Sequence, residues 1–234
     1  MTGEISARLT QIRERVNSIC VRLGRDPDQV RLMAVTKTVP AQYAEEAWQQ
    51  GIRLFGENRI PEGIEKFRAF RENHPPPETE VHMIGRLQRN KAKKAAEFFD
   101  CIQSVDRIEL INELGALTDG RKTPLNILLE YHTGEESKAG FPDMDSLFAA
   151  AEIVLSHPGL APLGLMTMAP YTGDQKTIRA AFRSCRIAAD GLKKRFGFDY
   201  WSCLSMGMSG DFETALEEGS NLIRIGTAIF GERQ

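Results

Sequence analysis

Two short segments near the end of this 234-residue chain combine residues that could bind a phosphate group. Residues 205–211, SMGMSGD, place glycines and hydroxyl side chains just before a predicted helix, where backbone amides carry partial positive charge. Residues 224–227, RIGT, add Gly226, which lets a ligand approach the backbone closely, and the hydroxyl of Thr227. Either segment alone could be an ordinary turn or strand end. Together they predict a cup for a phosphate dianion.

Lys37 ends an apolar run at residues 30–37 and could act in two ways beside such a cup. It could be a counter-charge for the phosphate, or its amine could attack a carbonyl and form a Schiff base. The second reaction needs the neutral amine, so the lysine pKa of roughly 10.4 would have to be lowered by burial or by a cation such as Arg224. The plain alternative is an exposed lysine that closes a strand.

Further polar residues lie within or just after predicted strands. His82 could stack on a ring or transfer a proton, although one histidine in a strand is more often a satisfied core residue. Asp106 is expected to cap a helix, with Glu109 three residues later completing a capping box. The basic segment 89–94, RNKAKK, predicts a solvated helix face, with an anion contact as the alternative. The other polar residues at strand ends are Glu57, Asn58, Arg86, Gln88, Ser104, His132, Glu135 and Lys138.

A regular alternation of helices and strands must position these residues. The first segment predicts an amphipathic helix, because apolar residues recur every three or four positions at Ile5, Leu9, Ile12, Val16, Ile19 and Leu23. Later helices include one from Asp143 to Ser156 and one with an apolar stripe from Ile178 to Phe196. Predicted strands cover residues 30–37, 53–58, 81–85, 101–105, 125–131, 163–168, 201–207 and 222–226.

This alternation predicts an α/β fold with a parallel sheet, most simply a single (β/α)8 TIM-type barrel preceded by the N-terminal helix. The rival is an open doubly wound sheet, but no GxGxxG motif follows the first strand. No linker or shift in composition divides residues 1–234, so we expect one domain. In a barrel, functional groups lie at the carboxyl ends of the strands, and closure would bring Lys37 beside the phosphate cup.

The composition argues against several other classes of protein. Hydrophobic residues make up 41% and charged residues 26%, as in ordinary globular proteins. A formal net charge of −2 does not favour a nucleic-acid binder. The four cysteines form no CxxC pair, so we expect neither a metal site nor a disulfide framework. No signal peptide or membrane-spanning run is recognisable, and we expect a cytoplasmic protein without membrane contact.

Several motifs occur in an order that resembles one known family. They are VTKT at 35–38, FGEN at 55–58, HMIGRLQRNK at 82–91, SVDR at 104–107, GEESKAGF at 134–141, LGLMTMAP at 163–170, SMGMSGDFETA at 205–215 and RIGTAIFG at 224–231. Over nearly its whole length the chain resembles the pyridoxal phosphate homeostasis protein family. The resemblance implies an alanine-racemase-like barrel, fold type III among proteins that use pyridoxal 5′-phosphate (PLP), with PLP as the cofactor.

The resemblance also implies roles for individual residues. Lys37 would carry PLP as a lysine aldimine, Arg224 would face the pyridine nitrogen, and Asn58 would lie beside the cofactor. One departure is His132, which stands near a position where the family commonly has an asparagine. The phosphate of PLP would be held by Ser205, Gly207, Gly226 and Thr227.

The resemblance favours a cofactor-binding protein over an enzyme. An arginine at the pyridine nitrogen keeps that nitrogen unprotonated and makes the ring a weaker electron sink. The resembling racemases take a second acid–base group from an additional domain, for which only residues 232–234 follow the last motif here. We therefore expect a protein without catalytic residues, monomeric, that serves intracellular PLP (vitamin B6) homeostasis by buffering PLP and supplying it to apoenzymes.

Two other functions stay open from the residues. One is a PLP-dependent amino-acid racemase that uses Lys37 and one local acid–base group, for which the candidates are Tyr131, His132, Tyr171 and His82. The other is a barrel enzyme acting on phosphorylated sugars, in which Lys37 would be a counter-charge or would form a transient imine with a sugar carbonyl.

Overall fold

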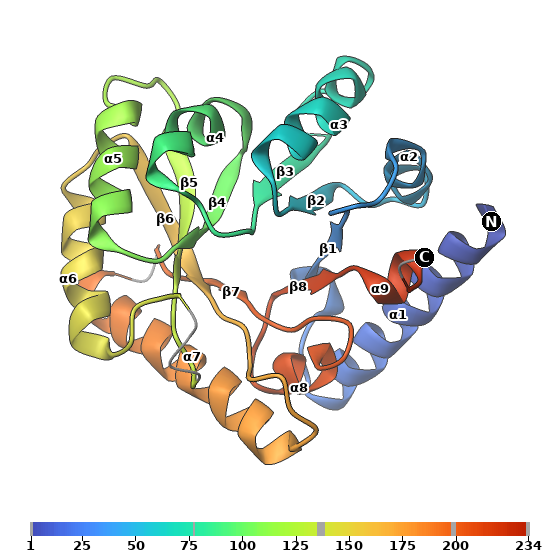
Figure 1. Ribbon diagram of the computed structural model, residues 1–234. Helices are drawn as coiled ribbons and strands as arrows, with labels where there is room; N and C mark the ends of the chain where they lie inside the picture. Colours follow the sequence, from blue (N-terminus) through green and yellow to red (C-terminus); the bar gives the residue numbers. More distant parts are fainter. Residues whose placement is uncertain (1, 77, 135–138, 198–199, 233–234) are drawn as a thin grey trace.

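Eight parallel strands form a closed barrel in the computed structural model, which describes residues 2–76, 78–134, 139–197 and 200–232 (Figure 1). The strands follow one another around the barrel in chain order, and β8 pairs with β1. The predicted TIM-type barrel is therefore confirmed and the open doubly wound sheet is excluded. The strands are β1 (Arg31–Val35), β2 (Leu54–Glu57), β3 (Glu80–Met83), β4 (Cys101–Val105), β5 (Leu125–Glu130), β6 (Leu160–Met166), β7 (Cys203–Ser205) and β8 (Leu222–Ile225).

Helices surround the barrel, and the N-terminal helix lies beside the last two helices of the chain (Figure 1). None of the helices in the described ranges is long and apolar enough to cross a membrane. Two short 3-10 helices, Pro27–Gln29 and Arg89–Lys91, precede β1 and α4. The α-helices are α1 (Thr2–Arg22), α2 (Ala41–Gln49), α3 (Ile60–Asn73), α4 (Ala92–Phe98), α5 (Ile108–Thr118), α6 (Met144–Leu155), α7 (Gln175–Phe196), α8 (Phe212–Glu217) and α9 (Thr227–Phe230).

The apolar stripe predicted for α1 is buried, with one exception. Leu9 and Ile12 are almost fully covered, and Ile5, Val16 and Ile19 lie on the same buried face. Leu23 is instead 39% exposed, because α1 ends at Arg22. A residue beyond the last turn no longer follows the helical period, so its side chain leaves the stripe.

Two aspartates cap the N-termini of helices with their side chains, and a third aspartate, which was predicted to do so, does not. Asp143 caps α6 in a reciprocal capping box with Ser146, and the Asp174 side chain accepts from the first amides of α7. The predicted cap at Asp106 is wrong. Helix α5 starts one residue later, with Arg107 at the N-cap and no side-chain cap bond. The Asp106 carboxylate instead contacts the guanidinium of Arg107, an ion pair that competes with capping.

The inside of the barrel is only partly apolar. Alternate residues of each parallel strand point inward, and small clusters fill part of the interior: Met33, Val35, Leu54 and Leu222 in one, Cys101, Leu128 and Met166 in another. The larger hydrophobic core lies between the strands and the helices. Buried polar side chains occupy part of the remaining interior, among them those of His82, Gln103, Ser205 and Arg224.

Side chains reinforce the short ladder between β7 and β8. Ser205 opposite Leu222 is the register pair that joins these two strands. Asn221 accepts from the Leu204 amide at 2.7 Å and donates to the Ser202 carbonyl at 2.8 Å. The buried Ser220 hydroxyl donates to the Met206 carbonyl at 2.7 Å. These side-chain bonds supplement the few backbone hydrogen bonds between β7 and β8, and they hold the loop after β7 against β8.

Replacing Asn221 by alanine is expected to lower the free energy of unfolding by about 1–3 kcal/mol, because the change leaves backbone groups of β7 without partners. Urea denaturation of the two proteins measures the difference. Ser202→Ala is the matched control, since it keeps the carbonyl that Asn221 uses. Equal stability of Asn221→Ala and wild type would show that these side-chain bonds do not stabilise the pairing of β7 with β8.

Candidate functional site

The lysine singled out by the sequence sits in a tight turn directly after β1. Lys37 is half-buried there. On its N-terminal side, the Thr36 amide donates to the Gly56 carbonyl at 3.0 Å, and the Thr36 hydroxyl donates to the Glu57 carboxylate at 2.7 Å. The Val39 amide closes the turn on the Thr36 carbonyl at 3.0 Å. The backbone that carries Lys37 is thus fixed to β2.

A buried ion pair between Lys66 and Glu57 stabilises the same turn. The Lys66 ammonium of α3 donates to the Thr36 carbonyl at 2.5 Å and to Glu57 Oε1 at 2.7 Å. The side chain of Glu57 is fully buried and that of Lys66 is 7% exposed, so both charges depend on each other. Burial raises the pKa of Glu57, and the hydrogen bonds from Lys66 and Thr36 oppose that rise.

The residue after the lysine has an unusual backbone conformation. Thr38 has a φ of 61°, in the left-handed region that β-branched residues rarely adopt. Its amide donates to Glu62 Oε1 at 2.5 Å, which holds this conformation. Sequence reasoning missed Glu62 and Lys66, whose only signal was their spacing of four residues on one helix. We call Glu57, Glu62 and Lys66 the lysine-turn clamp.

The glycine-rich loop after β7 is closed by its own residues. Gly207 has a φ of 97°, and a Cβ on it would lie 2.6 Å from the Cβ of Ala215, so no other residue fits there. The Met208 amide donates to Asp211 Oδ1 at 2.6 Å. The Ser209 hydroxyl accepts from the Ala228 amide at 3.2 Å, which ties the loop to the start of α9.

Barrel closure brings the lysine turn beside the residues that follow β8. Ala34 is in register with Ile225, and a Cβ placed on Gly226 would be 3.5 Å from Val35, an ordinary contact distance. Thr227 is exposed at the first position of α9. The structure therefore places Lys37, Gly226, Thr227 and the Gly207 loop at one end of three neighbouring strands, as the barrel prediction requires.

Asn58 lies next to this group, just after β2, and is half-buried. Its backbone packs tightly against the loop after β3, because a Cβ on Gly85 would lie 2.2 Å from the Asn58 carbonyl oxygen. The Ser104 hydroxyl donates to the Gly85 carbonyl at 2.6 Å and braces the same loop. Asn58 also lines a cavity that extends away from Lys37 toward β4.

Ser205 and Arg224 lie lower, inside the barrel. Ser205 is fully buried, and its hydroxyl donates to Gln103 Oε1 at 2.6 Å and accepts from Arg224 Nη1 at 2.8 Å. Arg224 also donates to the Ser205 carbonyl at 2.5 Å and to the Thr167 carbonyl at 2.8 Å. The Ser205 hydroxyl is thus committed to protein partners. Ser209, which the sequence reasoning did not choose, is the motif's other serine and stands in the loop itself.

The hydrogen bonds continue from Ser205 across the barrel interior. The Gln103 amide donates to His82 Nδ1 at 2.8 Å, and His82 Nε2 lies 3.2 Å from Glu80 Oε2. Arg31 pairs with the same carboxylate at 2.9 Å. Burial lowers the pKa of His82, so the ring is neutral and donates from Nε2, and that bond holds the pKa of Glu80 at about 2. His82 is therefore the satisfied core histidine of the plain interpretation.

The other polar candidates are dispersed. The Tyr131 hydroxyl lies 3.3 Å from the Ser184 hydroxyl on the outer side of the barrel, and Tyr171 is fully exposed. His132 is half-buried after β5. Glu135 and Lys138 fall outside the described residues. The structure does not bring Tyr131, Tyr171 and His82 together.

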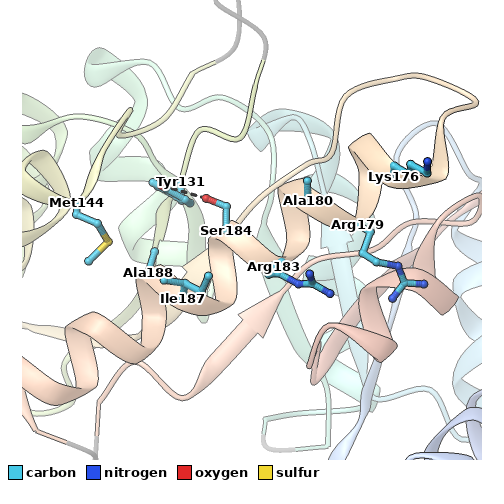
Figure 2. A pocket seen from close by; sticks show the side chains of 9 residues that line it. All are labelled: Tyr131, Met144, Lys176, Arg179, Ala180, Arg183, Ser184, Ile187 and Ala188. Carbon is cyan, nitrogen blue, oxygen red and sulfur yellow. Dashed lines mark hydrogen bonds between the residues drawn. The ribbon is translucent and has the colours of Figure 1, made fainter.

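Tyr131 and Ser184 border a groove on the outer face of α7 (Figure 2). Three cations line it: Lys176, Arg179 and Arg183. Both arginines pair with carboxylates at the end of α8: Arg179 contacts Glu217 and Glu218, and Arg183 donates to Glu218 at 2.9 and 3.1 Å. Tyr131 directly follows β5, but the other lining residues belong to α6 and α7, which cover the outside of the barrel.

Glu130 ends β5 at the barrel mouth and is 5% exposed. Burial raises its pKa to about 7, the nearby Asp106 charge adds to the rise, and Arg224 and Arg86 oppose it. Its protonation is therefore expected to respond to pH near neutrality. The sequence reasoning passed over it because Glu130 lies inside a predicted strand.

The chain is similar to known proteins over nearly its whole length. The alanine racemase N-terminal domain family model matches residues 7–234. A pyridoxal phosphate homeostasis protein of Vibrio cholerae is 39% identical over 98% of this chain and 96% of its own length. The chain belongs to the pyridoxal phosphate homeostasis protein family. The resemblance inferred from its motifs is confirmed.

Solved structures agree with the family. PipY of Synechococcus elongatus, described with PLP bound, is 33% identical and superposes with a TM-score of 0.83 over 97% of this chain and 100% of PipY. An alanine racemase of Bacillus anthracis has a TM-score of 0.71 at 19% identity, and the match covers 96% of this chain but 56% of the racemase. The second similarity shows the fold alone.

Replacing Lys66 by methionine is expected to lower the free energy of unfolding by about 3 kcal/mol, because Glu57 is then buried without its partner. Urea denaturation measures the loss. In the double variant Glu57→Gln/Lys66→Met, the two changes should cost less than the sum of the single changes. Additive losses would show that the two residues do not act as a pair.

Glu130→Gln is expected to be neutral in stability near pH 4 and to stabilise the fold by about 3 kcal/mol at pH 8, from the pKa near 7. The folded protein keeps the Glu130 proton to higher pH than the unfolded chain does. Wild-type stability therefore falls relative to the glutamine variant as pH rises from about 4.5 to 7. Urea denaturation of both proteins across this range checks it, and parallel pH profiles would contradict it.

Proposed function

We propose that this chain binds PLP covalently through Lys37 and serves as an intracellular store that supplies PLP to apoenzymes. The observation that carries the proposal is the meeting of the lysine turn with Gly226 and the Gly207 loop at the closed seam of the barrel. Support comes also from the relatives, which are named pyridoxal phosphate homeostasis proteins, and from PipY, which is described with PLP bound.

The residues present fit the cofactor. A phosphate needs donors and close backbone approach, and the Ser209 loop, Gly226 and the exposed Thr227 offer both. We assign Ser209, with Gly207, Gly226 and Thr227, to the phosphate. Ser205 would then act indirectly, by orienting Arg224 through the bond at 2.8 Å.

PLP supplies an aldehyde, which condenses with a lysine amine to form a carbon–nitrogen double bond and release one water. The chain's own residues set the conditions. The lysine-turn clamp fixes the backbone on either side of Lys37, so the amine is presented from a rigid turn. Arg224, buried and held by Ser205 and Thr167, is a fixed positive charge for the pyridine nitrogen, with Asn58 beside the ring.

The arrangement supports a store more than a racemase. A racemase needs a second acid–base group on the far face of the substrate. Of the four candidates, His82 is engaged inside the barrel, Tyr131 bonds outward to Ser184, and Tyr171 projects into solvent. His132, half-buried after β5, is the remaining candidate. An arginine at the pyridine nitrogen also gives less help to carbanion chemistry than a carboxylate would. Measuring exchange of an amino acid's α-proton with solvent tests this choice, since a store should show none.

The wild-type protein incubated with PLP is expected to show a visible absorbance band that borohydride removes, leaving a reduced adduct on the Lys37 peptide. Lys37→Ala should lack both the band and the adduct. Lys94→Ala, at an exposed site on α4, is the control and should retain both. An adduct on another lysine would refute the assignment.

The two glycines of the cup provide a second test. Gly226→Ala should keep the stability of the fold, because the new Cβ meets Val35 at an ordinary 3.5 Å, yet weaken PLP binding by about tenfold or more. Gly207→Ala should lower stability itself, because its Cβ would clash with Ala215. Titration of the visible band and urea denaturation separate the two effects. Wild-type affinity in Gly226→Ala would remove Gly226 from the phosphate site.

A further inference from the structure

A cavity of about 670 Å³ opens among the loops that follow β2, β3 and β4. It is separate from the phosphate cup, which follows β7 and β8. Asn58, which we place beside the PLP ring, also lines this cavity. The apolar residues of its lining are Ile60, Pro61, Met83 and Leu87, and of these Pro61 is exposed. A volume of this size is typical of sites for small organic ligands.

Cations dominate the lining of this cavity. Five of the lining residues are basic, and they come from three different loops: Arg59, Arg86, Arg89, Lys91 and Arg107. Because separate strands supply them, the clustering is a product of the barrel and not of one basic segment. Lys93 and Lys94, from the same basic run, are exposed and do not line the cavity.

Only part of this charge is neutralised. Arg107 contacts Asp106, and Arg86 lies 3.9 Å from the same carboxylate. Arg89 pairs with Glu113 at 2.8 Å. Arg59 and Lys91 have no carboxylate partner among the residues that the structure describes. The cavity therefore holds an excess of positive charge at the barrel mouth.

The groove on α7 shows the contrast (Figure 2). Its arginines, Arg179 and Arg183, are each bound to Glu217 or Glu218. Cations paired in this way hold helices together and gain little from a further anion. At the β2–β4 cavity Arg59 and Lys91 have no carboxylate partner within the described ranges, and the concave surface around them also carries apolar groups.

We infer that the β2–β4 cavity is a second binding site, for a phosphate monoester carried on a flat heterocyclic ring. Guanidinium and ammonium groups bind phosphate oxygens through charge-assisted hydrogen bonds, and Arg59 and Lys91 are the donors with capacity to spare. The exposed Pro61 and the apolar residues Ile60, Met83 and Leu87 behind it suit a ring, and Asn58 and Gln88 add amide groups to the lining. This site does not require the covalent bond at Lys37.

Two probes without an aldehyde test the site: pyridoxine 5′-phosphate and adenosine 5′-monophosphate, followed by isothermal titration calorimetry on the full-length protein. Before titration the protein is loaded with PLP and reduced with borohydride, so that the Lys37 site is filled. At least one phosphate ester should bind, and pyridoxine and inorganic phosphate should bind at least about tenfold more weakly. Pyridoxine has the ring without the phosphate, and inorganic phosphate has no ring, so these two compounds test the two halves of the proposed ligand separately. Failure of both esters to bind, or equal binding of inorganic phosphate, would overturn the inference.

The matched variants remove the same number of charges from two places. Arg59→Ala/Lys91→Ala should weaken binding of the phosphate ester by about tenfold or more, and Lys93→Ala/Lys94→Ala should leave it unchanged. Equal effects in the two variants would refute the site, because bulk charge would then explain both. Before the borohydride step, the visible band of the PLP-loaded protein should be the same in all of these variants. Absence of that band in every protein would refute the proposed PLP function and leave the ester titrations as an independent result.

Discussion

The candidate site depends on the pairing of β8 with β1. Residues from Arg31 opposite Leu222 to Ala34 opposite Ile225 are in register, and because the strands are parallel their carboxyl ends meet at one rim. That register sets Gly226 beside Val35, two residues before Lys37. The neighbouring seam, between β7 and β8, has a shorter ladder and relies on the side chains of Ser220 and Asn221. Both seams therefore contribute to the position of the phosphate cup.

A chain of hydrogen bonds inside the barrel complements this closure. It runs from Arg224 through Ser205 and Gln103 to His82, and each donor finds an acceptor. Burying an arginine is unfavourable unless its donors are satisfied, and here the Ser205 and Thr167 carbonyls accept from the guanidinium. A fully satisfied network of this kind gives the charge a single position, which a bound ring can use. The polar interior thus belongs to the site as much as the mouth does.

Cations near the barrel mouth are fully paired in one place and only partly paired in another. The lysine-turn clamp pairs its cation completely, since Lys66 bonds to Thr36 and Glu57 in a buried setting, and the result is a rigid backbone. Around the β2–β4 cavity, cations outnumber their carboxylate partners, and the result is a surface that attracts anions. The first arrangement serves structure and the second serves recognition, because only an unneutralised charge gains from a ligand.

The sequence by itself determined the barrel and pointed to the strand ends at which we propose the PLP site. The periods of strand and helix are local properties, so eight strands alternating with helices could be recognised, and Lys37, Gly207 and Gly226 stood out by residue type and place. The partners of each side chain were decided by the tertiary structure. Ser205 points into the barrel, Lys66 supports the lysine turn, and Asp106 pairs with Arg107 instead of capping α5. Such contacts depend on strand register and on which loops meet across the closed barrel, and these are set by packing between segments far apart in the chain.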